Sequence, residues 1–180
     1  YGVYSYADYL LWKFKERVEL FKGKLFKMSA PSAVHQEISM KLAGELYQFL
    51  KGKDGKVFHA PFDVRLLKEA QEDKDIYTVV QPDICVVCDP EKIDKRGCEG
   101  VPDLVIEILS PGNSKKEMKF KYALYEEAKV PEYWIIDPDH QNILVYILKG
   151  DKYQNPINVI DDYIPSEKFP TLKLHTNDIF

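Results

Sequence analysis

Apolar side chains recur along several segments of this chain with the spacing of an α-helix. In the clearest segment they are separated by four, four and three positions, at Ile38, Leu42, Leu46 and Phe49. This spacing predicts an amphipathic helix over residues 32–51. Capping-box patterns that begin at Ser5 and Ser114 predict two further helices, over residues 6–15 and 114–128.

Other segments are runs of β-branched and aliphatic residues, which are typical of β-strands. The predicted strands cover residues 17–21, 24–28, 56–67, 78–88, 103–109, 132–137 and 142–148. The first two form a hairpin around a Lys22-Gly23 turn. No repeat or linker divides the 180 residues, so we expect a single domain over residues 1–180. The predicted fold is α/β, with a central mixed β-sheet flanked by helices after an N-terminal helix and β-hairpin.

Two carboxylates interrupt these apolar runs. Asp83 lies within residues 79–87 and Glu107 lies within residues 104–109. A buried carboxylate costs free energy unless a cation or hydrogen bonds compensate for the lost water. If the two strands are neighbours, the alternation of side chains along each strand lets the two carboxylates converge. Oxygen ligands of this kind suit Mg²⁺ or Mn²⁺ better than zinc.

Lys121 is a cation at a position where the helical pattern predicts burial. It belongs to a stripe at spacings of three, four and three, formed by Met118, Lys121, Tyr125 and Ala128. A lysine on the core side of a helix requires a neighbouring anion, and Asp83 and Glu107 are the candidates. Each of these three residues also has a simpler interpretation: Asp83 at a strand end, Glu107 on an exposed edge strand, and Lys121 with its ammonium in solvent.

The composition narrows the classes of function. Basic residues number 25, of which only three are Arg, against 29 acidic residues, so the net charge is −4 and any phosphate contact must be local. No apolar run reaches the roughly 18 residues of a membrane span. Three cysteines do not make a disulfide framework, so we expect a cytoplasmic protein without a membrane partner. Cys85 and Cys88 point to opposite faces of a strand and are not expected to share a metal or a disulfide.

Several motifs together are similar to one known family. They are Gln81-Pro82-Asp83, PDLVIEILSP at 102–111, KYALY at 121–125, VPEYWIIDP at 130–138, ELFKGKL at 19–25, and His35 at the start of the predicted helix. As a set, they resemble the Uma-type restriction endonuclease family, long listed as a domain of unknown function, in the PD-(D/E)xK nuclease superfamily. The resemblance extends over nearly the whole chain.

The resemblance implies a restriction-endonuclease-like fold and Mg²⁺- or Mn²⁺-dependent hydrolysis of phosphodiester bonds in DNA. Asp83, Glu107 and the backbone carbonyl of Ile108 would hold the metal ion. The position of the superfamily's (D/E)xK lysine is occupied by Leu109, so the resemblance takes this lysine from the following helix, as Lys121. Lys121 would orient the attacking water or stabilise negative charge in the transition state.

Glu19 and His35 are further candidate catalytic residues. Acidic residues from early elements complete the metal shell in some members of the superfamily, and Glu19 would take that place; a solvent-facing carboxylate of the hairpin is the alternative. His35 lies in the first turn of the helix over 32–51, where the helix dipole favours the neutral imidazole. A packing or capping histidine is the alternative for His35.

Two other functions are compatible with the same sequence. One is a nucleic-acid-binding or regulatory module that keeps the fold without catalysis, and the other is a structural metal-binding domain of a larger assembly. An active nuclease requires Lys121 to lie inward beside two carboxylates, whereas a binding module does not. Cleavage of both strands of a duplex would favour a homodimer, although no surface stripe in the sequence identifies an interface.

Overall fold

A computed structural model describes residues 3–67, 71–110 and 115–180 of the protein, without the side chains of residues 115–117. The described helices are α1 (Tyr6–Leu11), α2 (Ala33–Leu50) and α3 (Lys115–Glu127), with 3₁₀ turns η1 (Asp73–Asp75), η2 (Pro90–Lys92) and η3 (Thr176–Asp178). The described strands are β1 (Val18–Phe21), β2 (Lys24–Lys27), β3 (Lys56–His59), β4 (Val64–Arg65), β5 (Val79–Val80), β6 (Ile84–Val87), β7 (Ile93–Asp94), β8 (Gly97–Glu99), β9 (Leu104–Ile108), β10 (Glu132–Asp137), β11 (Asn142–Lys149), β12 (Lys152–Tyr153) and β13 (Ile157–Val159).

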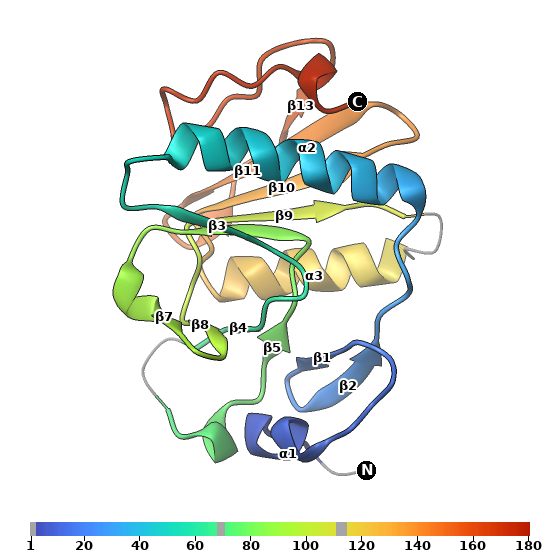
Figure 1. Ribbon diagram of the computed structural model, residues 1–180, viewed down its shortest axis with the longest axis vertical. Coiled ribbons are helices and arrows are strands. Elements are labelled where there is room, and N and C mark those ends of the chain that lie inside the picture. Colours follow the sequence, from blue (N-terminus) through green and yellow to red (C-terminus); the bar gives the residue numbers. More distant parts are fainter. Residues whose placement is uncertain (1–2, 68–70, 111–114) are drawn as a thin grey trace.

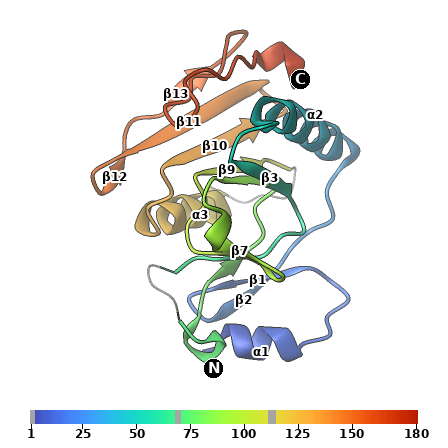
Figure 2. The same ribbon diagram turned by 60° about the vertical axis from the view of Figure 1, so that its left-hand side comes forward.

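The larger of two sheets has the strand order β12-β11-β10-β9-β6-β3, with β13 paired to β11. Strands β9 and β10 are parallel and their neighbours are antiparallel, so the sheet is mixed, as predicted. Helix α2 covers one face of this sheet and α3 the opposite face (Figures 1 and 2). The central strands are apolar on both sides because alternate residues pack against the two helices. Cys85 packs on the α3 side and Cys88 on the α2 side, so their thiols face apart.

The smaller sheet has the strand order β2-β1-β5-β4-β8-β7 and lies beyond α3 in Figure 1. Phe21 of β1 and Val64 of β4 belong to the same apolar cluster as the inward residues of α3. Helix α1 closes the far side of this sheet through Tyr6, which is fully buried. The helix α3 is therefore packed between the two sheets.

Two strand predictions are wrong in their extent, because each predicted strand is divided between the two sheets. The predicted strand 56–67 consists of β3 in the larger sheet and β4 in the smaller one, with Pro61 between them. The predicted strand 78–88 likewise consists of β5 and β6, with Pro82 between them. Proline has no N–H to donate to a β-ladder, so strand pairing ends at these positions. The two crossings lie side by side, since the Ala60 N–H donates to the Asp83 carbonyl at 3.0 Å.

Other predictions differ from the structure in the length or the number of the elements. Helix α1 has the predicted capping box at Ser5, but it ends at Leu11 rather than near residue 15. Leu11 is 80% exposed and Phe14 45% exposed, so a longer helix would bury no apolar face. The capping box predicted at Ser114 lies outside the described residues. The short strands β7, β8, β12 and β13 were not predicted.

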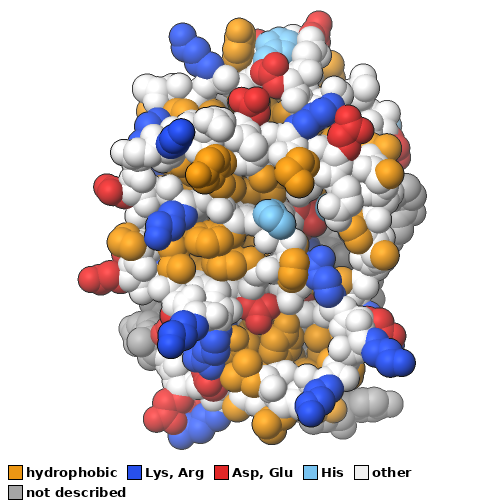
Figure 3. Space-filling model, viewed as in Figure 1, with side chains coloured by type: hydrophobic (Ala, Val, Ile, Leu, Met, Phe, Trp, Pro, Cys, Tyr) orange, Lys and Arg blue, Asp and Glu red, His pale blue; other side chains and the backbone are white. Residues whose placement is uncertain are grey.

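The surface carries charges of both signs without a broad basic strip on the face shown in Figure 3. Lysine and arginine side chains there are scattered among acidic and apolar ones. This distribution agrees with a net charge of −4. Within the described residues, no helix has the length and apolar character needed to cross a membrane.

Candidate active site

One cleft between the two sheets brings together every candidate residue predicted from the sequence. Its lining includes Glu19 of β1, His35 of α2, Asp83 directly before β6, Glu107 and Ile108 of β9, and Lys121 of α3. Its volume of about 100 Å³ accommodates an ion with a few waters but not a nucleotide.

The pairing of β6 with β9 explains why Asp83 and Glu107 meet. These strands are antiparallel neighbours, with Ile84 opposite Ile106. Continuing that register by one residue places Asp83 opposite Glu107. The convergence of the two carboxylates, predicted from the alternation along each strand, is confirmed by this geometry.

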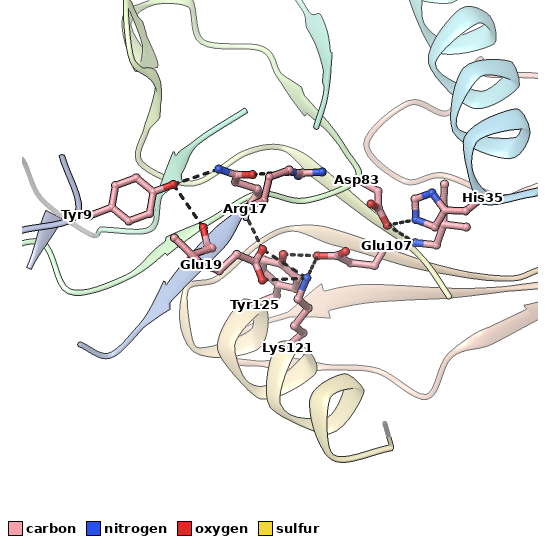
Figure 4. A network of polar contacts seen from close by, with 11 residues as sticks. Tyr9, Arg17, Glu19, His35, Asp83, Glu107, Lys121 and Tyr125 are labelled. Atoms are coloured by element: carbon pink, nitrogen blue, oxygen red, sulfur yellow. Dashed lines mark hydrogen bonds and ion pairs between the residues drawn. The ribbon is translucent and has the colours of Figure 1, made fainter. Parts of the chain in front are cut away.

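Lys121 lies inward from α3 and contacts two carboxylates. Its Nζ is 3.0 Å from Oε1 of Glu107 and 3.4 Å from Oε2 of Glu19 (Figure 4). The sequence predicted that Asp83 and Glu107 would be the anions beside Lys121. In the structure these anions are Glu107 and Glu19. Glu19 takes the place of Asp83 because its strand, β1, pairs with β5 next to the crossing into β6. Glu19 is held in turn by the Gln81 N–H, which donates to its Oε1 at 2.8 Å. Glu19 is thus buried at the site, and the solvent-facing alternative is wrong.

The electrostatics of this cluster reflect burial and an excess of negative charge. Burial raises the pKa of Glu107 to about 7, opposed by Lys121 and reinforced by Asp83 and Glu19. Burial also raises the pKa of Glu19, against the lowering effect of Lys121. For Lys121, burial would lower the pKa, but Glu107 and Glu19 together raise it above its usual value. One lysine therefore does not fully balance three carboxylates in this cleft.

Asp83 is fixed by two hydrogen bonds to the same oxygen. Its Oδ2 accepts the Ile108 N–H at 2.8 Å and lies 3.1 Å from Nε2 of His35. The hydrogen bond to Asp83 raises the pKa of His35 although burial lowers it, so Asp83 opposes the preference for a neutral imidazole that the helix dipole is expected to give. The Nδ1 atom of His35 is buried and has no hydrogen-bond partner among the described residues.

The donor set fits a hard divalent cation that keeps several waters. No described residue hydrogen bonds to Oδ1 of Asp83 or to Oε2 of Glu107, so each carboxylate has one oxygen bound within the protein and one without such a partner. Within the described part of the chain, no group of three or more His, Cys, Asp or Glu side chains is arranged so that it could hold a metal ion. Mg²⁺ commonly binds through one or two carboxylates and completes its octahedron with water.

Comparison with known proteins places this chain in a family. The sequence model of the Uma2 family, described as "Putative restriction endonuclease", matches residues 6–177. The chain belongs to the Uma2 family. An uncharacterized protein of Synechocystis sp. is 26% identical over 152 residues, which are 82% of this chain and 75% of that protein.

A solved structure has the same fold as this Uma2 chain. It is the crystal structure of "a putative nuclease belonging to DUF820" from Anabaena variabilis, which matches with a TM-score of 0.76 at 22% identity. The match covers 98% of this chain and 97% of that chain. The resemblance to the Uma-type family and the nuclease-like α/β fold, both predicted from the sequence, are confirmed.

Sequence reasoning missed five side chains around the site of this Uma2 protein. Tyr125 donates its hydroxyl to Oε1 of Glu107 at 2.6 Å, and its place on the Lys121 stripe was a usable signal. Gln81, Tyr9 and Asp63 form a polar cluster that supports Arg17 at the cleft. Arg17 had been interpreted only as the first residue of a hairpin strand. The scarcity of arginine in a lysine-rich chain was the signal available for it.

Proposed function

We propose that this protein is a Mg²⁺-dependent endonuclease that hydrolyses phosphodiester bonds in DNA. The observation that carries the proposal is the inward placement of Lys121, 3.0 Å from Glu107, in a cleft that also contains Asp83. A binding module would have no use for a buried cation beside two buried carboxylates, which is costly to maintain. Membership of the Uma2 family supports a nuclease activity.

Asp83, Glu107 and the backbone carbonyl of Ile108 would hold the metal ion. Asp83 and Glu107 each have one oxygen without a hydrogen-bond partner among the described residues, and Ile108 lines the same cleft. When bound, a divalent ion polarises the scissile phosphate and lowers the pKa of a coordinated water. Glu19 is bound to Gln81 and Lys121, so its role is to position the lysine.

Lys121 would act on the reacting phosphate as a hydrogen-bond donor. Its ammonium has three donors, and Glu107 and Glu19 hold it at the floor of the cleft. A donor fixed at this place stabilises negative charge as it develops on the phosphate oxygens, and also orients the attacking water. Removing one such preorganised donor commonly costs about 10²–10³ in rate.

The experiment is cleavage of supercoiled plasmid with Mg²⁺ or Mn²⁺. We expect Lys121→Met and Asp83→Asn to lose at least about 10²-fold in rate, while Lys119→Met, on the exposed side of the same helix, retains activity. Parallel reactions with RNA and single-stranded DNA of the same sequence test the choice of substrate. Metal-dependent cleavage that survives both site substitutions unchanged would refute the proposal. Linear product formed directly, rather than through nicked circles, would favour a homodimer.

A thermal-shift titration with Mn²⁺ separates the nuclease from its rivals. A ligand that binds only the folded protein raises the melting temperature as its concentration exceeds Kd. We expect stabilisation of the native protein, its loss in Glu107→Gln, and its retention in Glu45→Gln on the exposed side of α2. No stabilisation of the native protein would favour a metal-free binding module. Stabilisation without any cleavage would favour a structural metal-binding domain.

A further inference from the structure

Arg17 differs from the other two arginines of the chain in its electrostatic environment. Arg65 is buried and paired with carboxylates of Asp94 and Glu99, at 2.7 and 3.2 Å. Arg96 is paired with Asp73 at 2.6 Å. Across the described residues, no carboxylate lies within ion-pair distance of Arg17. Its charge is therefore uncompensated by direct contact.

A neutral amide holds the Arg17 guanidinium in place. Nε of Arg17 donates to Oε1 of Gln81 at 2.9 Å. The amide nitrogen of Gln81 donates to Oδ1 of Asp63 at 2.8 Å and to the Tyr9 hydroxyl at 3.1 Å. Because Asp63 can only accept when ionised, this network fixes which end of the amide faces the guanidinium. The amide oxygen of Gln81 therefore faces Arg17 as an acceptor. Because the amide is neutral, it leaves the positive charge of the guanidinium in place.

The side chain of Arg17 lines the cleft, and its Nη2 atom is not used by the Gln81 contact. Arg17 lines it together with Asp83, Glu107 and Lys121. Figure 4 places Arg17 between Tyr9 and the pair formed by Asp83 and His35. Its Nη2 atom is buried and has no hydrogen-bond partner among the residues described. A fixed guanidinium whose Nη2 has no partner is suited to donate to an oxygen of an anion such as phosphate.

We propose that Arg17 forms a phosphate-binding subsite in the wall of this cleft, which binds a non-bridging oxygen of the nucleic-acid backbone beside the phosphate that is cleaved. This inference rests on the proposed function, because it assigns to the same cleft a contact with the substrate backbone. Arg17 directly precedes β1 and Lys121 belongs to α3, so the two cations reach the cleft from different elements. The two cations would then contact neighbouring parts of one strand.

The test is DNA binding without cleavage. Fluorescence anisotropy of a labelled oligonucleotide duplex in EDTA, over a series of salt concentrations, compares the native chain with Arg17→Gln, Arg17→Lys and Lys24→Gln. Lys24 is exposed on the same hairpin, so Lys24→Gln removes an equal charge away from the cleft. Thermal melting of each variant checks that it is folded. If Arg17→Gln is not folded, Arg17→Lys takes its place in the comparison.

We expect Arg17→Gln to weaken binding about tenfold, the effect of losing one charged hydrogen bond. The slope of log K against log salt should become shallower by about 0.9, as for one lost phosphate contact. Arg17→Lys should restore the slope but only part of the affinity, since lysine lacks the planar pair of donors. Lys24→Gln should match the native protein in both.

Equal affinity and slope in Arg17→Gln and Lys24→Gln would overturn the inference, as would a native chain that does not bind the duplex at all. A purely structural arginine would lower the melting temperature and leave the salt slope unchanged. The plasmid assay separates this result from the proposed function. A native chain that binds DNA through Arg17 but never cleaves it would retain the subsite and refute the nuclease.

Discussion

Replacing Lys121 by methionine should destabilise the metal-free protein strongly. Lys121 is 7% exposed, and its partners Glu107 and Glu19 are 8% and 3% exposed. Methionine keeps most of the length of the side chain but leaves two buried carboxylates without their cation. Removing one partner from a buried ion pair typically costs about 3–5 kcal/mol. For a chain of 180 residues, this corresponds to a fall in melting temperature of about 6–20 °C.

The assay is urea denaturation in EDTA, with Lys119→Met as the matched control. An exposed lysine of the same helix should change stability by less than about 0.5 kcal/mol. Combining Lys121→Met with Glu107→Gln should recover about 1–3 kcal/mol relative to the sum of the single variants, because the two groups are coupled. The reasoning fails if Lys121→Met is as stable as Lys119→Met, or if the double variant shows no coupling.

Three further predictions follow from contacts around the site and at the opposite end of β9. Tyr125→Phe removes the hydroxyl that donates to buried Glu107, so unfolding in urea should require about 1–3 kcal/mol less. Burial raises the pKa of Asp103, but the ion pair with Lys168 and a backbone N–H outweigh it and lower that pKa below its usual value. The stability that Asp103 contributes is therefore complete above the unfolded carboxyl pKa of about 3.9 and is lost as the pH falls further, so the melting temperature of Asp103→Asn should depend less on pH over that acidic window. Gln81→Met keeps the backbone N–H that binds Glu19 but removes the side-chain amide that holds the Arg17 guanidinium. The variant should therefore bind DNA severalfold more weakly, as measured by fluorescence anisotropy. Unchanged binding would show that Arg17 does not need the Gln81 amide.

The central carboxylates could be predicted because local patterns determine where they point. Asp83 and Glu107 interrupt apolar strands, and the period of two assigns each to a face. Lys121 is on the inward stripe of its helix by the same reasoning with a period of 3.6. The structure agrees with these three placements, since they depend only on residues close in sequence.

The rest of the site could not be predicted because it depends on contacts between distant elements. Glu19 meets Lys121 across a sequence separation of 102 residues, and no periodicity indicates which strand lies opposite a given helix face. The crossings at Pro61 and Pro82 carry the chain from one sheet to the other, and this brings Glu19 of the smaller sheet next to the carboxylates of the larger one. A proline within an apparent strand does indicate an interruption, but it does not specify where the next strand will pair.

The arrangement of charge in the cleft resolves how an acidic protein would contact a phosphate backbone. Glu19 is bound to Lys121 and to a backbone N–H, so it anchors a cation rather than repelling substrate. Asp83 and Glu107 each keep one oxygen without a hydrogen-bond partner among the described residues, and a divalent ion bound there would offset the negative charge that adds to burial in raising the pKa of Glu107. Arg17, held by a neutral amide, adds a positive charge with no acidic partner among the described residues. Phosphate affinity would then be concentrated in one cleft and would depend on both the metal and the salt concentration, since the face shown in Figure 3 adds no broad basic strip to it.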